Sequence, residues 1–188
     1  QAYAEGHRPE EQSALPPDWQ SIHIRNLSFH YEGNDGRPQG IHRLNLQLHR
    51  GKRIALIGES GSGKSTLLAV LRGLYRPEPG VMAVVDGREK GPLDIISSHV
   101  TLFPQEPEIF ENTIAYNITL GLPFPEDEIN RICDAAHFSE VVALLPQGLQ
   151  SKIQEKGVNL SGGQKQRLAL ARGILAARDS DLVLLDEP

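Results

Sequence analysis

Cysteine is nearly absent from this sequence, because Cys133 is its only example among 188 residues. A single cysteine permits no disulfide within the chain, and its commonest role is that of a small buried apolar residue. Long hydrophobic runs are also missing, since no stretch approaches the roughly 18–20 apolar residues that cross a membrane. These absences exclude a disulfide-stapled scaffold and a membrane-spanning helix as explanations of this sequence.

Positive charge is not in excess either. The formal net charge is -5, so no large nucleic-acid footprint is indicated and we expect no nucleic-acid partner. The seven histidines are scattered singly, and none stands at metal-ligand spacing with a second ligand. The composition, with 39% hydrophobic and 23% charged residues, is typical of one globular domain with a real core.

Methionine occurs only at position 82, while the sequence begins with Gln1 and stops at Pro188 directly after an apolar run. Both ends therefore look cut, and we expect a fragment of a longer protein. Residues 1–19 are polar and acidic with three prolines and no periodicity, which predicts a linker. Trp19 is expected to mark where packing begins.

The hydrophobic pattern predicts an α/β protein. Alternating residues across 21–50 indicate an antiparallel sheet, and a strand between two turns is expected within 77–88. Short apolar runs predict further buried strands at 53–58, 100–105 and 181–188. Helical spacing predicts a helix at 64–75, a mostly helical region at 111–146 that Pro123 and Pro125 interrupt, and an amphipathic helix at 162–177.

The stretch GESGSGKST, which we call the phosphate loop, has the pattern G-x-x-x-x-G-K-[ST] between a predicted strand and a predicted helix. Glycines let the backbone turn its N–H groups toward a phosphate, and the helix directs its positive end there. Lys64 would contact the β- and γ-phosphates, and Ser65 would offer an oxygen to Mg²⁺. ATP and Mg²⁺ are therefore the expected ligands. The residues assigned to nucleotide binding are Gly58, Glu59, Ser60, Gly61, Ser62, Gly63, Lys64, Ser65 and Thr66.

Two acids follow the last apolar run, LVLL. A nucleotide site of this type needs a carboxylate for Mg²⁺ at the end of a buried strand, and Asp186 is the expected ligand. Glu187 is placed to act as the general base on a water that attacks the γ-phosphate. The alternative is a solvated acidic turn after a strand.

A second glycine loop, LSGGQKQR at residues 160–167, poses a problem because one small domain needs only one phosphate loop. Ser161 is well placed as a helix N-cap, and Gly162 and Gly163 expose backbone N–H groups at the start of a helix. An ordinary capped helix would need the serine, but it would not need two glycines, which weaken a helix. Two subunits arranged head to tail, each completing the other's site, would explain the second loop.

These three segments together resemble the nucleotide-binding domain of ABC (ATP-binding cassette) proteins. The phosphate loop is similar to the Walker A loop, residues 160–167 to the signature motif and LVLLDEP to the Walker B strand. The resemblance covers about residues 20–188. It implies a P-loop core with a parallel sheet, an antiparallel β subdomain at about 21–50 and a helical subdomain at about 106–160. It also implies that ATP lies between two such domains, contacted by Ser161, Gly162, Gly163 and Gln164 of the partner.

The resemblance assigns further roles. Tyr31 is similar to the aromatic residue that stacks on adenine, although a tyrosine of the strand core is the alternative. Gln105 is similar to the Q-loop glutamine, which contacts Mg²⁺ and the attacking water. Residues 110–118 resemble exporters, in which this stretch contacts the membrane domain. Residues 154–157 resemble the exporter X-loop, with Gln154 where the family usually has glycine.

The family's D-loop and switch histidine follow Walker B, and this sequence has neither. We therefore expect the chain alone to bind ATP but to hydrolyse it weakly or not at all. The expected function is the ATPase domain of an ABC exporter at the cytoplasmic face of a membrane, in a bacterial inner membrane, as a homodimer or heterodimer. The alternatives are a soluble ABC ATPase of DNA repair or translation, and a binding-only domain that regulates a complete one.

Overall fold

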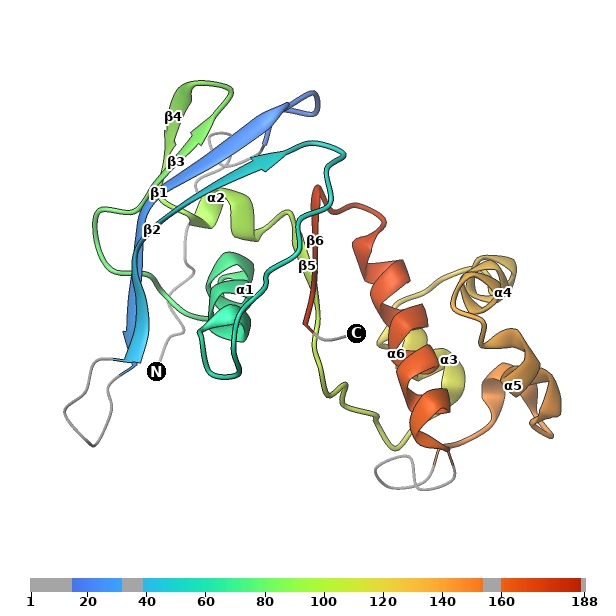
Figure 1. Cartoon of the computed structure of the whole chain (residues 1–188). Helices are drawn as coiled ribbons and strands as arrows, with labels where there is room; N and C mark the ends of the chain where they lie inside the picture. Colours follow the sequence, from blue (N-terminus) through green and yellow to red (C-terminus); the bar gives the residue numbers. More distant parts are fainter. Residues whose placement is uncertain (1–14, 32–38, 154–159, 187–188) are drawn as a thin grey trace, which may run out of the picture. The chain divides into compact units, whose positions relative to one another are not determined.

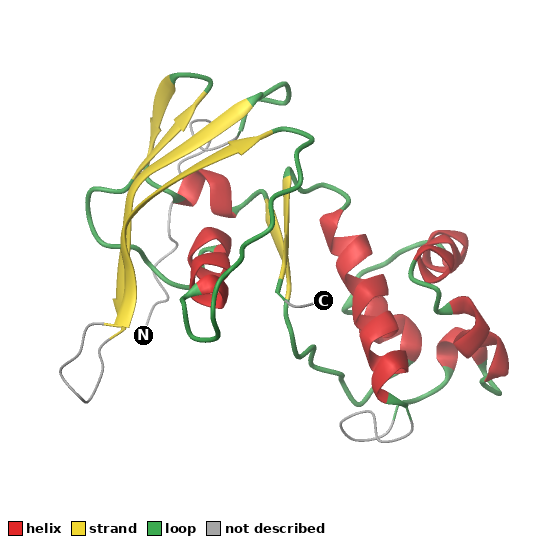
Figure 2. Cartoon of the chain, in the orientation of Figure 1, coloured by secondary structure: helices red, strands yellow, loops and turns green. Residues whose placement is uncertain are grey.

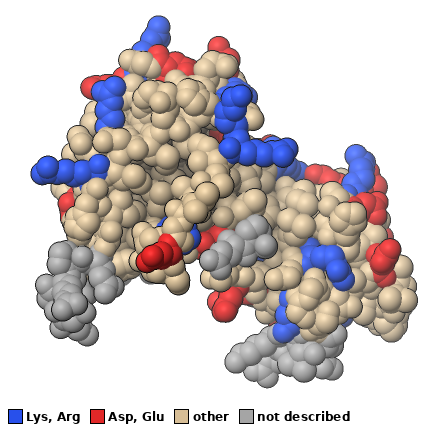
Figure 3. All heavy atoms as spheres, viewed as in Figure 1, with Lys and Arg blue, Asp and Glu red and all other residues tan. Residues whose placement is uncertain are grey.

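The computed structural model describes residues 15–31, 39–153 and 160–186, and the chain divides into two compact units, residues 1–100 and 101–188 (Figure 1). Strands and helices occur in both units, which confirms the predicted α/β class. None of the helices in the described ranges is long and apolar enough to cross a membrane. On the face shown in Figure 3, Lys and Arg side chains are interspersed with Asp and Glu.

The first unit is built on an antiparallel sheet of four strands in the order β2-β1-β3-β4 (Figure 2). Its strands are β1 (Ser21–Tyr31), β2 (Gln39–His49), β3 (Met82–Val85) and β4 (Arg88–Gly91). The alternating start of β1 buries Ile22 and Ile24 completely, as a half-buried strand requires. Leu27 is completely buried as well, because the register shifts between Ile24 and Leu27. The sheet extends beyond the predicted 21–50, because β3 pairs with the other edge of β1.

Helix α1 (Lys64–Arg72) lies in the same unit and buries Leu67, Leu68, Val70 and Leu71. It ends earlier than predicted, because Gly73 adopts a left-handed backbone with φ 82° and its N–H caps the last turn. The short helix α2 (Asp94–Ser97) follows β4.

The predicted strand at 53–58 is wrong for this structure. Residues 52–59 have no regular secondary structure, and Ile57 is 95% exposed. A strand of this length is stable only when neighbouring strands satisfy its backbone groups, and no strand of the first unit pairs with this segment.

The predicted linker, residues 1–19, is described only from Leu15 onward, and both Leu15 and Trp19 are buried there. The Asp86 carboxylate accepts hydrogen bonds from the backbone N–H groups of Gln20, at 3.0 Å, and Ser21, at 2.7 Å. Packing therefore begins before Trp19 within the described residues, while the linker boundary stays a prediction.

The second unit contains the two-stranded parallel sheet of β5 (Val100–Phe103) and β6 (Leu182–Leu185). Its helices are α3 (Ile114–Thr119), α4 (Glu126–Ala135), α5 (Ser139–Leu144), the 3-10 helix η1 (Gly148–Gln150) and α6 (Gly162–Ala177). The bounds of α6 are those predicted. The predicted helical region at 111–146 is interrupted between Thr119, the last residue of α3, and Glu126, the first residue of α4. Strand β6 is less buried than predicted, because only Leu184 is buried in it.

The core of the second unit lies among its helices, with α3 and α4 both packed against α6. Phe138 is completely buried there, so the turn between α4 and α5 anchors both helices. The buried residues of this core are Ile114, Ile118, Ile129, Ile132, Cys133, Ala136, Phe138, Val141, Leu149, Ile153, Leu160, Leu168, Ala171 and Leu175.

Candidate functional site

The phosphate loop leads directly into α1, as the motif requires. Gly61 and Gly63 have φ angles of 78° and 90°, in the left-handed region where any other L-residue is strained. Gly63 is the N-cap of α1, and its carbonyl accepts a hydrogen bond from Leu67 N–H at 2.9 Å. At Gly58, a Cβ atom would lie 2.8 Å from Ser62 Oγ, a contact that rotation of the serine side chain can relieve. The backbone of this loop therefore requires glycine at Gly61 and Gly63.

Lys64 turns back into the phosphate loop. Its Nζ donates hydrogen bonds to the carbonyl oxygens of Gly58 and Glu59, both at 2.9 Å, and lies 3.5 Å from Ser62 Oγ. A lysine charge within a loop that leads into a helix N-terminus provides suitable chemistry for binding a triphosphate. The loop is largely exposed, so a ligand can reach it.

Tyr31, at the end of β1, lies beside the start of α1. Its hydroxyl is 3.1 Å from Thr66 Oγ1, and the side chain is 41% exposed, so it is not a core residue. Its ring meets Phe29 edge-on at 5.0 Å and Tyr75 edge-on at 5.6 Å, while Phe29 and Tyr75 stack at 5.1 Å. We call Phe29, Tyr31 and Tyr75 the aromatic cluster.

Tyr75 is the member of the aromatic cluster that sequence reasoning missed. A hydrogen bond with Tyr31 raises the pKa of Tyr75 above its ordinary value. The two tyrosines are therefore joined by this hydrogen bond as well as by the contact between their rings. The only signal in the sequence is an aromatic residue at the end of the predicted helix. In the structure α1 ends at Arg72, the left-handed turn at Gly73 follows, and the Tyr75 ring contacts Tyr31.

In the second unit, β5 and β6 bring two predicted site segments together. The backbone N–H of Asp186 donates to the Phe103 carbonyl at 3.0 Å, so Asp186 lies beside the end of β5. Gln105 follows that end by two residues and is exposed. The carboxyl ends of parallel strands form one edge, where ligands commonly bind. Glu187, Gln154 and the rest of 154–157 lie outside the described residues.

The second glycine loop begins α6 with a capping box. Ser161 Oγ accepts from Gln164 N–H at 3.3 Å, while Gln164 Oε1 accepts from Ser161 N–H at 2.8 Å. Neither Gly162 nor Gly163 has a positive φ, and a Cβ at either position would meet no atom within 4 Å. The capped-helix interpretation accounts for Ser161 and Gln164, but packing among the described residues does not account for the glycines.

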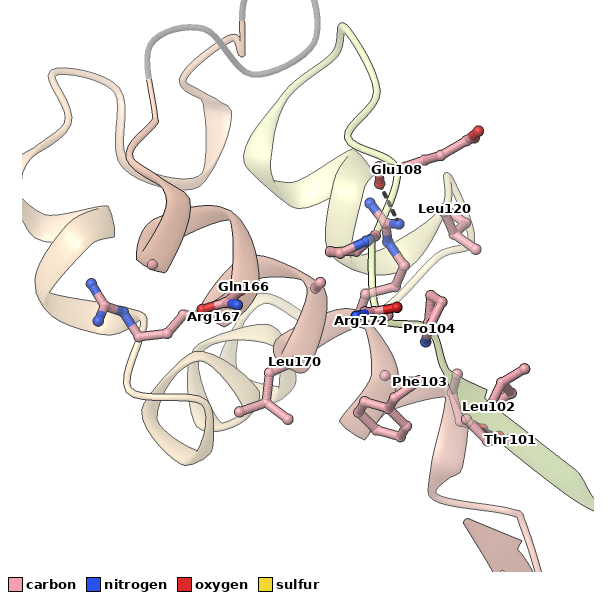
Figure 4. Close-up of a pocket in the computed structure, with 16 residues that line it drawn as sticks. Thr101, Leu102, Phe103, Pro104, Glu108, Leu120, Gln166, Arg167, Leu170 and Arg172 are labelled. Carbon is pink, nitrogen blue, oxygen red and sulfur yellow. Dashed lines mark hydrogen bonds between the residues drawn. The ribbon is translucent and has the colours of Figure 1, made fainter. Parts of the chain in front are cut away.

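A cavity of about 370 Å³ lies in the second unit between the segment after β5 and helix α6 (Figure 4). Gly173 permits this packing, because a Cβ there would lie only 2.1 Å from the Phe103 ring. Arg172 reaches from α6 to the Glu108 carbonyl at 2.7 Å. The cavity lining is Thr101, Leu102, Phe103, Pro104, Gln105, Pro107, Glu108, Leu120, Gly163, Gln166, Arg167, Ala169, Leu170, Arg172, Gly173 and Ala176.

The predicted site residues thus fall into two sets, one in each unit. Tyr31 and the phosphate loop belong to the first unit, while Gln105, Asp186 and the second glycine loop belong to the second. The structure brings Tyr31 to Thr66 and brings Asp186 to the strand that leads to Gln105. A shared Mg²⁺ site of Ser65, Gln105 and Asp186 stays a prediction.

Residues 41–188 match the ABC transporter family. The chain is 39% identical over 170 residues to an ATP-dependent lipid A-core flippase of Pseudomonas aeruginosa, covering 88% of this chain and 27% of that protein. It is 39% identical over 171 residues to the ABC multidrug transporter atrD of Emericella nidulans, covering 88% and 12%. A solved bacterial Atm1-family ABC exporter with ATP bound aligns with a TM-score of 0.75 at 31% identity, covering 92% and 30%. The chain therefore spans less than a third of each of these proteins.

Proposed function

This chain belongs to the ABC transporter family and has its ABC ATPase fold, and on that premise we propose that it binds and hydrolyses ATP to drive an exporter. The single observation that carries the proposal is the phosphate loop, in which Lys64 lies against the Gly58 and Glu59 carbonyls at the start of α1. A triphosphate would exchange those carbonyl contacts of Lys64 for contacts with phosphate oxygens.

Each predicted residue then has a role, and Gln105 has two, because it would contact both Mg²⁺ and the attacking water. Thr66 and the rest of the phosphate loop hold the triphosphate, and Tyr31 offers its exposed ring to adenine. Mg²⁺ would be held by Ser65, Gln105 and Asp186, and it supplies charge neutralisation for phosphoryl transfer. Glu187 takes the proton from the attacking water.

The partner is a second copy of such a domain, identical or related. Support comes from Gly162 and Gly163, which cost helix stability and are required by no contact within the described residues. Glycine at a helix start lets an anionic ligand approach the backbone N–H groups closely. We propose that these groups, with Ser161 and Gln164, contact the γ-phosphate bound to the phosphate loop of the partner.

The membrane-facing surface is proposed to be the segment at 110–118. Phe110 and Tyr116 are 40% and 38% exposed and meet edge-on with ring centres 6.4 Å apart. Exposed aromatic pairs of this kind are typical of contact surfaces. The partner there would be a membrane domain, which places this chain at the cytoplasmic face of a membrane, in bacteria the inner membrane. Relatives that are a flippase, a multidrug transporter and an exporter favour this proposal over a soluble ATPase of DNA repair or translation.

The test is a calorimetric titration with Mg-ATP of this chain, of Lys64→Ala and of Lys90→Ala. Lys64→Ala should weaken binding by roughly 10- to 100-fold, because a charge-assisted contact to phosphate is lost. Lys90, an exposed lysine of β4 in the same unit, is the matched control and should leave affinity unchanged. Unaltered binding in Lys64→Ala would contradict the loop assignment. In a separate assay of phosphate release, the unmutated chain alone should hydrolyse ATP weakly or not at all.

A further inference from the structure

Asn117, on helix α3, is completely buried and uses its whole amide group in hydrogen bonds. Its Oδ1 accepts from the Phe110 backbone N–H at 2.9 Å, and its Nδ2 donates to the carbonyls of Phe110, at 2.9 Å, and Thr113, at 3.0 Å. The Asn117 side chain therefore binds both the N–H and the carbonyl group of Phe110, as a neighbouring strand would. These two hydrogen bonds fix the backbone of Phe110, although its ring is 40% exposed.

Arg172, on helix α6, completes this network from the other side. Its Nε donates to the Asn117 carbonyl at 2.6 Å, its Nη1 to the Glu108 carbonyl at 2.7 Å and its Nη2 to Asn117 Oδ1 at 3.1 Å. The guanidinium also lies 5.1 Å from the centre of the Phe110 ring. One planar side chain thus joins three segments, namely α6, α3 and residues 108–110.

Arg172 carries its charge into a partly buried position. The three oxygens that accept hydrogen bonds from its guanidinium, the carbonyls of Asn117 and Glu108 and Asn117 Oδ1, are neutral. Loss of hydration lowers the pKa of Arg172 below its ordinary value, and the Glu108 charge opposes this shift without cancelling it. A partly buried cation costs desolvation that an apolar side chain of similar size avoids. What arginine alone supplies is a rigid fork with several donors in fixed directions, which lysine lacks.

We propose that Arg172 is a positioning residue that couples the start of α6 to the aromatic surface of Phe110 and Tyr116. This rests on the proposed function, in which that start contacts nucleotide. Arg172 lies ten residues after Gly162, about 15 Å along the axis of one continuous helix. Any displacement of α6 on nucleotide contact is carried through Arg172 to Asn117 and Glu108, and so to Phe110.

The experiment is amide hydrogen exchange of residues 107–118 in the intact protein, with and without Mg-ATP. The variants are Arg172→Lys, which keeps the charge but not the fork, and Asn117→Asp, which keeps the acceptor for Arg172 but not the donors to Phe110. Arg178→Lys is the matched control, because Arg178, the C-cap residue of α6, likewise lies over a ring, that of Phe124 at 4.8 Å. Its hydrogen bonds go to Asp179 and Glu128, which are not part of this network.

Without nucleotide, exchange at Phe110 N–H should become at least roughly three- to tenfold faster in Arg172→Lys and Asn117→Asp. Each variant loses at least one hydrogen bond of the network, and Asn117→Asp loses both donations of Nδ2. The ATP-dependent change across 107–118 should disappear in both variants and persist in Arg178→Lys. The double variant should resemble the more affected single variant, because both residues act in one unit.

Affinity for ATP, measured on the same samples, separates this inference from the proposed function. If no variant and no wild-type sample binds ATP, the proposed function fails. If Arg172→Lys binds ATP as the wild type does and keeps its full ATP-dependent exchange change, the coupling role of Arg172 is refuted.

Discussion

Replacing the glycines of α6 by alanine should change stability with opposite signs along one helix. Alanine stabilises a helix relative to glycine by up to about 1 kcal/mol. At Gly163, where a new Cβ meets no atom within 4 Å, that gain is unopposed. We expect Gly163→Ala to stabilise the chain by about 0.5–1 kcal/mol, or roughly 1–4 °C in the unfolding midpoint.

At Gly173 the same substitution meets the Phe103 ring, with new contacts of 2.1, 2.5 and 2.6 Å. The ring must move by more than about 1 Å to restore an ordinary contact, and such overpacking typically costs about 1–3 kcal/mol. After the helix gain of about 1 kcal/mol is subtracted, Gly173→Ala should destabilise the chain by up to about 2 kcal/mol. The extra Phe103→Leu substitution should relieve most of this loss, because the smaller side chain leaves room for the methyl group.

The assay is urea unfolding followed by circular dichroism on the four proteins, with Mg-ATP-dependent dimerisation measured in parallel by sedimentation on the intact protein. Gly163→Ala should be more stable yet dimerise less, since its methyl group blocks the approach of phosphate to the helix start. Equal stabilisation by Gly163→Ala and Gly173→Ala would refute the reasoning about Phe103. A more stable Gly163→Ala that dimerises normally would remove the functional explanation of that glycine.

Two further expectations concern stability. Backbone hydrogen bonds, first of all that from Ser21, lower the pKa of Asp86; its contribution to stability is therefore complete above the unfolded-state value of about 4 and is lost as pH falls through the lower folded-state value. The melting-temperature difference between wild type and Asp86→Asn should shrink accordingly in thermal melts between about pH 6 and 2, and a constant difference would contradict this. Phe138→Ala should cost about 3–5 kcal/mol in urea unfolding, because the ring is completely buried, whereas Leu144→Ala, at a position 85% exposed, should change stability by less than about 0.5 kcal/mol; similar losses from both would refute the core assignment.

Local sequence patterns predict best the elements whose ends are set by residues close together in the sequence. Helix α6 has the predicted bounds because Ser161 and Gln164 form its N-terminal cap from residues three apart. Helix α1 begins as predicted after Gly63 but ends before the predicted Tyr75, because the left-handed turn at Gly73 ends it. The apolar run at 53–58 was wrong as a strand, because a strand exists only where another chain segment pairs with it.

The sequence by itself determined the chemistry: the phosphate loop, the two acids, the second glycine loop and the family they indicate, because each depends on residue types at short, definite spacings. Only the tertiary structure decided which distant residues meet. It placed Tyr75 against Tyr31, and it joined Arg172 to Asn117 and Glu108. Such contacts depend on how helices and strands pack in three dimensions, and no spacing along the chain specifies them.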